Sequence, residues 1–123
     1  MRTMGGDTYF TPPEATQVVA DVLRRVLVRE AIVPVVRGPA NAHNSSGAPA
    51  GRRRAEQVNR EFDGLLTAMC QGCHVTYVSA TGALDNPAYL QRDELHDTAE
   101  GHLAIGELEG GAIADAWLAA KGH

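Results

Sequence analysis

The chain has 123 residues, the length of one domain that can bury a hydrophobic core. Hydrophobic residues make up 44% of it and charged residues 21%, a balance that excludes a disordered chain. The formal charge of −4 argues against a nucleic-acid partner. The sequence has no apolar run of the roughly 18 residues that a membrane span needs, and it shows no signal peptide. It therefore favours a soluble protein, without assigning a compartment.

The first expected element is a helix that begins near Thr11. Gly5-Gly6-Asp7-Thr8 comes before it, after only four residues, which are too few for a full strand. Thr11 and Glu14 are spaced as the first and last residues of a capping box, with proline at the first helical positions. Apolar residues then follow the helical period and predict one buried face. They are Val18, Val19, Val22, Val26 and Leu27.

A short apolar strand is expected over Pro34–Arg37, because proline is tolerated at the first residue of a strand. The stretch Gly38–Gly51 is rich in Gly, Pro, Ser, Asn and Ala, which predicts a loop. Loops of this length are commonly functional or mobile. His43, Ser45 and Ser46 lie in it, but no fixed base accompanies them, so a solvated loop is the favoured interpretation.

A second helix is expected over Arg52–Met69, with Gly72 as its C-terminal stop. A strand over Val75–Ser79 should follow it. The residues of the helix that are expected to face inward are Ala55, Val58, Phe62, Leu65, Leu66 and Met69.

Cys70 and Cys73 have the C-x-x-C spacing. They close a helix instead of opening one, so they lack the positive helix N-terminus that lowers the thiol pKa in redox motifs. One pair also falls short of the four ligands of a structural zinc site. A local disulfide or two unpaired thiols is therefore the favoured interpretation.

The last helix is expected over Thr98–Ala119. Asp97 and Glu100 have the spacing of its N-cap and third residue in a capping box. Its expected apolar side contains Ile105, Leu108, Ala112, Ala116 and Trp117, with the tryptophan in the core.

Four glycines fall inside this last helix. Gly101 lies in its first turn, where it would let the helix approach its neighbours closely. Gly106, Gly110 and Gly111 each cost a helix roughly 1 kcal/mol relative to alanine. Close packing of these three on the sheet is the expected compensation.

Helices and strands thus alternate, and the chain begins where a strand would end. Such alternation predicts an α/β fold with a parallel sheet and helices on both faces. Active groups in these sheets lie in loops beyond the carboxyl ends of the strands. Gly5–Thr8 and Asp93–His96 both hold that position, so residues 1–123 are interpreted as a single α/β domain with its site there.

Asp93 and His96 are three residues apart and can meet on one turn of chain. A hydrogen bond from the imidazole to a carboxylate fixes the ring tautomer and stabilises the imidazolium, which a general base for a hydroxyl nucleophile requires. The plainer interpretation is a helix cap beside a surface histidine.

Asp-x-x-His followed by a helical turn with Gly-His resembles the last conserved block of the SGNH (GDSL-type) hydrolases, which are serine esterases and lipases. The resemblance implies that Asp93 and His96 are the triad acid and base. It also implies a flavodoxin-like sheet in a three-layer α/β/α fold, without a cofactor or a metal ion. It covers nearly the whole chain but only the carboxyl-terminal part of the family's domain, so the fold is expected to be truncated at its N-terminus.

The same resemblance aligns Gly5-Gly6-Asp7-Thr8 with the family's Gly-x-Asn-Asp block, which supplies an oxyanion donor, and Asn59 with an asparagine common in the family. Asp7 replaces the donor asparagine, and an ionised carboxylate only accepts hydrogen bonds. No Gly-Asp-Ser nucleophile block precedes it. A rival alignment makes Thr8 the nucleophile, but the path from Thr8 to His96 is too short to include the missing blocks.

The resemblance implies hydrolysis of an acyl ester of a small molecule or carbohydrate. His96 would take the proton from a serine supplied outside this chain, and Asp93 would hold the ring. One alternative is a non-catalytic, truncated α/β module that binds a partner or self-associates through an uncovered sheet edge. Another is a zinc hydrolase that uses Asp93, His96 and His102, although His102 lies six residues beyond His96 inside the helix.

Overall fold

The computed structural model of the chain describes residues 11–29, 32–40, 49–90 and 98–122. Helices and strands alternate along them, which confirms a small α/β fold. The elements are α1 (Pro12–Leu27), β1 (Val35–Arg37), α2 (Pro49–Cys73), β2 (Thr76–Val78), a 3₁₀ helix (Pro87–Tyr89) and α3 (Ala99–Ala120).

The sheet of the described residues has two strands, and they are parallel as predicted. Val36 of β1 pairs with Tyr77 of β2, and α2 connects the two strands. The Gly38 N–H donates to the Val78 carbonyl at 3.0 Å and extends the pairing one residue beyond β1. Each strand is only three residues long, so both are shorter than the sequence pattern predicts.

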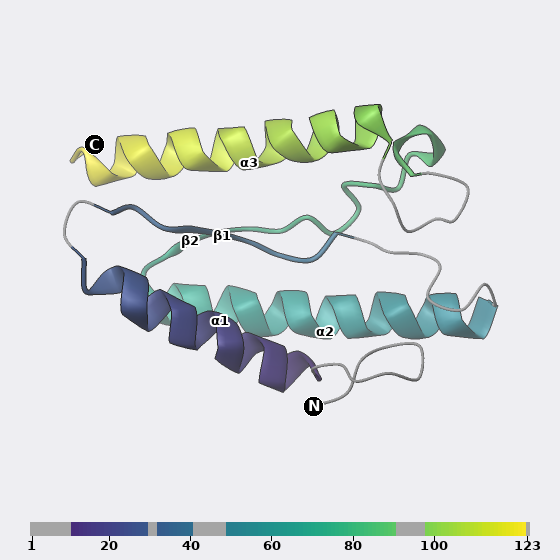
Figure 1. The fold of residues 1–123 in the computed structure, drawn as a ribbon, viewed down its shortest axis with the longest axis horizontal. Coiled ribbons are helices and arrows are strands. Elements are labelled where there is room, and N and C mark those ends of the chain that lie inside the picture. The colour runs from purple at the N-terminus through teal and green to yellow at the C-terminus, as the bar shows by residue number, and fades with distance from the viewer. Residues whose placement is uncertain (1–10, 30–31, 41–48, 91–97, 123) are drawn as a thin grey trace.

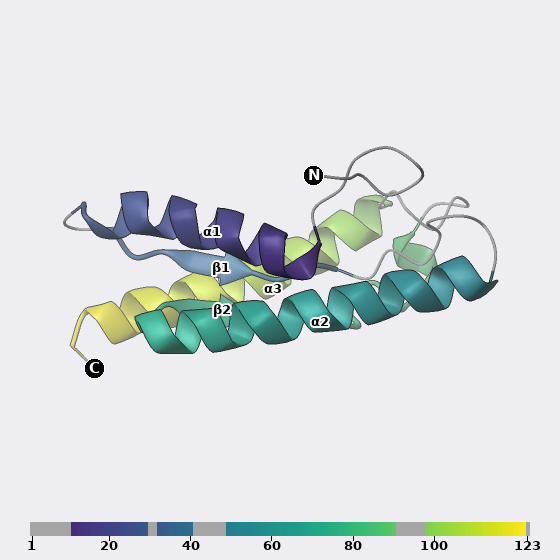
Figure 2. The same cartoon turned by 90° about the horizontal axis from the view of Figure 1, so that it is seen from below.

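Helices lie on both sides of the strands. Figure 1 shows α3 on one side and α1 with α2 on the other, and Figure 2 shows α1 and α2 from below, in front of the strands. An exposed ion pair joins the sheet to α3, because Arg37 Nε donates to Glu109 Oε1 at 2.9 Å. Such exposed pairs contribute at most about 1 kcal/mol, so apolar packing carries most of this attachment.

The core has two separate clusters. The first lies between α1, α2 and the strands, and it consists of Leu23, Cys70 and Val75 with Val19, Val36, Met69 and Tyr77 packed on them. The second lies between α3 and the chain that follows the strands, and it consists of Ala80, Leu84 and Ile105 with Ala40, Ala83, Tyr89, Leu90 and Leu108 packed on them. We call the second one the α3 cluster.

The predicted start of α1 is confirmed. Thr11 is its N-cap, and Thr11 and Glu14 form the complete capping box. The predicted buried face is partly wrong, because Leu23 is the buried residue while Val18 and Val22 are exposed. Valine and leucine occur on more than one side of α1, so periodicity alone does not identify the packed side.

Helix α2 extends past both of its predicted ends. It begins at Pro49, inside the predicted loop, and ends at Cys73. Gly72 is therefore helical and does not stop it. The stop is His74, at φ 57°, with the Val75 N–H donating to Cys70 O at 2.9 Å and the His74 N–H to Gln71 O at 3.3 Å. These two bonds form a Schellman motif, which an apolar contact between the residues on either side of the helix end frequently accompanies.

Helix α3 was predicted correctly in extent but not in its cap. Thr98 is the N-cap, and its hydroxyl accepts from the Gly101 N–H at 3.1 Å. Asp97 was therefore the wrong choice by one residue. The predicted capping box is also wrong, because the third helical residue is Gly101 and not Glu100.

The outer surface of α3 contradicts two further predictions. Trp117, expected in the core, is 52% exposed. Gly106, Gly110 and Gly111 do not pack on the sheet, because a Cβ at any of them would meet nothing within 4 Å. Only Gly101 makes a close contact, against the backbone of Tyr89.

Candidate functional site

The residues predicted to form the site lie outside the described residues. They are Asp93 and His96 in one segment and Gly5, Gly6, Asp7 and Thr8 in the other. His43, Ser45 and Ser46 also lie outside them. The structure describes the chain on either side of residues 91–97, and we call these two stretches the frame. They are residues 87–90, which include the 3₁₀ helix, and residues 98–101 at the start of α3.

Two hydrogen bonds join the two sides of this frame, and a third caps α3. The Thr98 N–H donates to the Tyr89 carbonyl at 3.0 Å. The Thr98 hydroxyl donates to the Ala88 carbonyl at 2.6 Å and accepts from the Gly101 N–H. The 3₁₀ helix that precedes residues 91–97 is thus bonded directly to the N-terminus of α3, which follows them.

Gly101 brings the two sides still closer. A Cβ at this position would overlap the carbonyl oxygen of Tyr89 and lie 3.0 Å from its carbonyl carbon. Because these are backbone atoms, no side-chain movement can relieve the overlap. The predicted role of Gly101 in a close approach is confirmed. The start of α3 therefore lies directly against the backbone of Tyr89.

The frame lies beside the carboxyl ends of both strands. Tyr89 and Leu90, at the start of the segment, pack in the α3 cluster with Ala40, which follows β1, and Ala80, which follows β2. Catalytic and binding groups of parallel α/β sheets gather in loops at this end.

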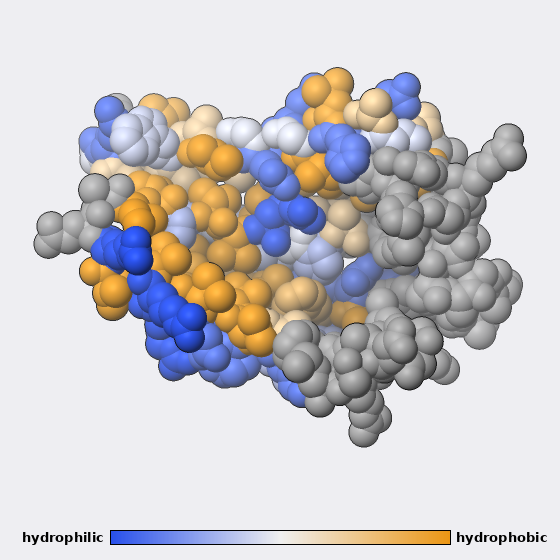
Figure 3. Space-filling model, viewed as in Figure 1, coloured by the Kyte–Doolittle hydropathy of each residue, from blue (hydrophilic) through white to orange (hydrophobic). Residues whose placement is uncertain are grey.

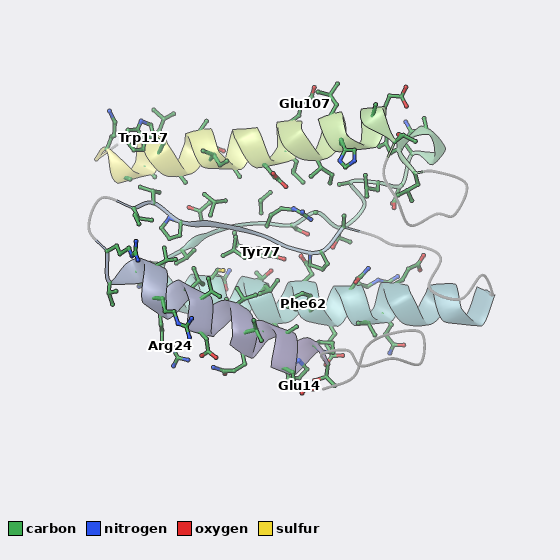
Figure 4. The ribbon with its side chains drawn as sticks, in the orientation of Figure 1. Glu14, Arg24, Phe62, Tyr77, Glu107 and Trp117 are labelled. Atoms are coloured by element: carbon green, nitrogen blue, oxygen red, sulfur yellow. The ribbon has the colours of Figure 1, made fainter. Side chains whose placement is uncertain are left out.

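A polar group at the same end was not singled out from the sequence. Asp63 of α2 accepts hydrogen bonds on one carboxylate oxygen from the Tyr77 hydroxyl at 2.5 Å and the Ser79 hydroxyl at 2.9 Å. Figure 4 shows Tyr77 between the strands and α2. Burial, together with the bond to Asp63, raises the pKa of the Tyr77 hydroxyl.

This polar group also restricts the start of the chain after β1. A Cβ at Gly38 would overlap the Tyr77 hydroxyl and lie 3.0 Å from Asp63 Oδ1. The group therefore fixes where the carboxyl end of β1 lies against β2 and α2. Tyr77 and Ser79 share a strand face at a spacing of two, a signal present in the sequence. Nothing distinguished Asp63 from the other polar residues of α2.

The described residues offer no metal centre. No group of three or more His, Cys, Asp or Glu side chains in them could hold an ion. His102 is exposed on α3, while the other two residues of the zinc hypothesis lie outside the described part.

The C-x-x-C pair closes α2 and precedes β2, as predicted, and both thiols are free. Cys70 is fully buried and Cys73 is exposed. Burial raises the pKa of the Cys70 thiol, and Cys73 nearby raises it further. A thiol with a raised pKa is a poor nucleophile at neutral pH.

No helix among the described elements is long and apolar enough to cross a bilayer. A shallow depression lies beside Asp21, Arg24, Arg25 and Val28. All four belong to α1 and its C-cap, so it is unrelated to the frame of residues 91–97. In comparisons with known proteins, no family model, no curated protein and no solved structure matches the chain.

Proposed function

We propose that the chain carries the general base and the orienting acid of an SGNH-type ester hydrolase, His96 and Asp93. The observation that supports this proposal is the frame around residues 91–97. Its two ends are joined by the Thr98–Tyr89 hydrogen bond, and it lies beside the carboxyl ends of two parallel strands. Because two residues that flank this segment, Tyr89 and Thr98, are held together, the positions open to an acid and a base three residues apart are restricted, as catalysis by a paired base requires.

In the proposed reaction a serine hydroxyl attacks the ester carbonyl while His96 accepts its proton. The tetrahedral intermediate collapses, and His96 returns the proton to the leaving alcohol. Water then hydrolyses the acyl-enzyme by the same base. The serine would come from outside residues 1–123, and the substrate would be an acyl ester of a small molecule or carbohydrate.

The proposal also makes β1 and β2 the last two strands of a larger flavodoxin-like sheet, with a further strand beside β1. Exposed apolar residues on that side support this reading. They lie on α1, at its end and just before β1: Val18, Val22, Leu27, Val28, Ile32 and Val33. Figure 3 shows apolar surface over the part of the molecule that presents α1 and β1. A strand and a helix added there would bury it.

Hydrolysis of a short-chain aryl ester tests the catalytic part. Any surface imidazole cleaves such esters slowly, and the chain has five histidines. The comparison is therefore between His96→Ala and the matched His102→Ala, which removes an exposed histidine of α3. Because the proposed serine lies outside residues 1–123, we expect only slow turnover of the ester, in which His96 activates water. His96→Ala and Asp93→Ala should lower this turnover below that of His102→Ala, by less than the roughly 10²–10⁴-fold that a positioned base contributes in a complete site.

Thr8→Ala in the same assay asks whether the chain supplies its own nucleophile. Loss of turnover in Thr8→Ala as well as His96→Ala would mean a one-chain esterase with a threonine nucleophile. Equal turnover in His96→Ala, His102→Ala and the unchanged chain would contradict the proposal. That result would favour the second candidate, a non-catalytic α/β module. The exposed apolar surface of α1 supports this candidate, because a binding partner could cover it.

A further inference from the structure

Helix α3 has two apolar faces. One packs on the strands and buries Gly101, Ile105 and Ala116. The other faces away from them and contains residues spaced alternately by three and four. They are Leu103, Gly106, Gly110, Ile113 and Trp117, and we call them the outer stripe. Leu103, Ile113 and Trp117 are 64%, 56% and 52% exposed. Figure 4 shows Trp117 and Glu107 on the side of α3 away from the strands.

The spacing of the outer stripe is that of a helix seam. Alternating steps of three and four place apolar residues along one line of a helix and match a second helix packed against it. A single-domain surface helix needs only one such line, and a helix apolar on both sides is normally covered on both sides.

The glycines of the stripe agree with this reading. Gly106 and Gly110 cost α3 stability, and among the described residues nothing occupies the space where their Cβ atoms would lie. Small residues at the centre of a helix seam let two helix backbones approach closely. Leu103 and Trp117, at the two ends of the stripe, then contribute the large apolar area.

The charges of α3 favour antiparallel over parallel pairing with a second copy of this helix. Glu100 lies in the first turn and Glu107 about two turns later, while Lys121 follows the last turn and lies 4.7 Å from the centre of the Trp117 ring. Parallel pairing of two copies would place Glu100 against Glu100 and Lys121 against Lys121. Antiparallel pairing centred on Gly110 instead brings Glu100 next to the partner's Lys121, and it opposes the two helix dipoles favourably.

The same register matches shapes. It places Leu103 opposite the partner's Trp117, Gly106 opposite the partner's Ala114, and Gly110 opposite itself. A two-fold interface must be self-complementary in this way. We propose that the outer stripe binds the outer stripe of a second copy of the chain, with the two α3 helices antiparallel and in closest contact at Gly110.

One helix pair makes a small interface, at or below the roughly 1,200 Å² at the low end of specific complexes. We therefore expect a reversible dimer whose population rises with concentration. Sedimentation velocity of residues 1–123 over a wide concentration series measures it. A chain that remains monomeric throughout overturns the proposal.

Gly110→Glu tests the position of the contact. It places two carboxylates face to face on the two-fold axis, and we expect the dimer dissociation constant to rise roughly tenfold or more. The control is Gly64→Glu on α2, where a Cβ also meets nothing within 4 Å. It adds the same charge and should leave the dimer unchanged. Because Gly110 is open in the monomer, circular dichroism should show both variants folded. Equal dissociation constants for the two variants would overturn the proposal.

Charge reversal tests the direction. Glu100→Lys and Lys121→Glu should each weaken the dimer, and the double variant should restore it. A double variant as weak as the single ones rules out the antiparallel register. None of these measurements involves ester turnover, so they stand independently of the proposed hydrolase.

Discussion

Gly101 and Gly106 lie little more than one turn apart on α3, yet their surroundings are opposite. A Cβ at Gly101 would overlap the backbone of Tyr89, whereas one at Gly106 would meet nothing within 4 Å. The sequence treats both as helix-weakening glycines of equal cost. At the residue scale the structure separates a glycine needed for close packing from one whose Cβ position is open among the described residues.

Alanine at the two positions should act with opposite sign. We expect Gly101→Ala to lower the free energy of unfolding by roughly 1–3 kcal/mol, because overpacking against backbone forces a shift. Gly106→Ala should raise it by up to about 1 kcal/mol through helix propensity. Urea unfolding at low protein concentration measures both without interference from association. A stabilising Gly101→Ala would mean that the backbones of α3 and Tyr89 are not in contact.

At the scale of elements, hydrogen bonds at helix ends position the described residues on either side of residues 91–97. Thr98 caps α3 and also bonds to Ala88 and Tyr89. This one residue therefore joins the start of α3 to the 3₁₀ helix on the other side of residues 91–97. The cap of α1 differs, because among the described residues the Thr11 side chain bonds only to Glu14 of its own helix. A cap that bonds two elements stabilises more than the helix it begins.

Thr98→Ala should therefore cost more than Thr11→Ala. Loss of an N-cap typically costs about 1 kcal/mol, with a range of roughly 0.5–2. Thr98→Ala also leaves the Ala88 carbonyl without its hydroxyl donor, so we expect the upper part of that range. Thr98→Ser keeps the hydroxyl and should be close to the unchanged protein. Chemical denaturation of the three variants provides the test, and a serine variant as unstable as the alanine one would contradict this role of the hydroxyl.

At the scale of the whole molecule, two ionisable groups in the packed interior link stability to alkaline pH. Cys70 and Tyr77 both have a pKa raised by burial above their ordinary values of 9.0 and 10.0. Above those values the unfolded chain releases protons that the folded chain retains. Deprotonation therefore favours the unfolded state, and stability falls as pH rises.

We expect the urea midpoint to be insensitive to these two groups below about pH 9 and to decline above it. Each group that stays protonated contributes at most about 1.4 kcal/mol per pH unit. Tyr77→Phe should flatten the decline above pH 10, and Cys70→Ala should flatten it from pH 9 upward. Parallel curves for the unchanged protein and both variants would show that neither group is protected in the fold.

The sequence by itself determined part of the local structure of this protein. The Thr11–Glu14 capping box, the extent of α3 and the order of helices and strands follow from short-range spacing, and all are present in the structure. The parallel sheet follows from that order, because a helix between two strands returns the chain to the same end. Asp93, His96 and Gly5–Thr8 remain predictions, since they lie outside the described residues.

Tertiary structure decided which side of each helix is packed and where helices stop. His74, not Gly72, ends α2 in the left-handed conformation, and Cys70 and Val75 on either side of it belong to the core cluster with Leu23 of α1. Asp63, Tyr77 and Ser79 form a polar group because α2 packs beside the end of β2. Trp117 is exposed because no described element covers that side of α3. Periodicity records that a helix has an apolar side, but only the position of neighbouring elements determines which apolar side is covered.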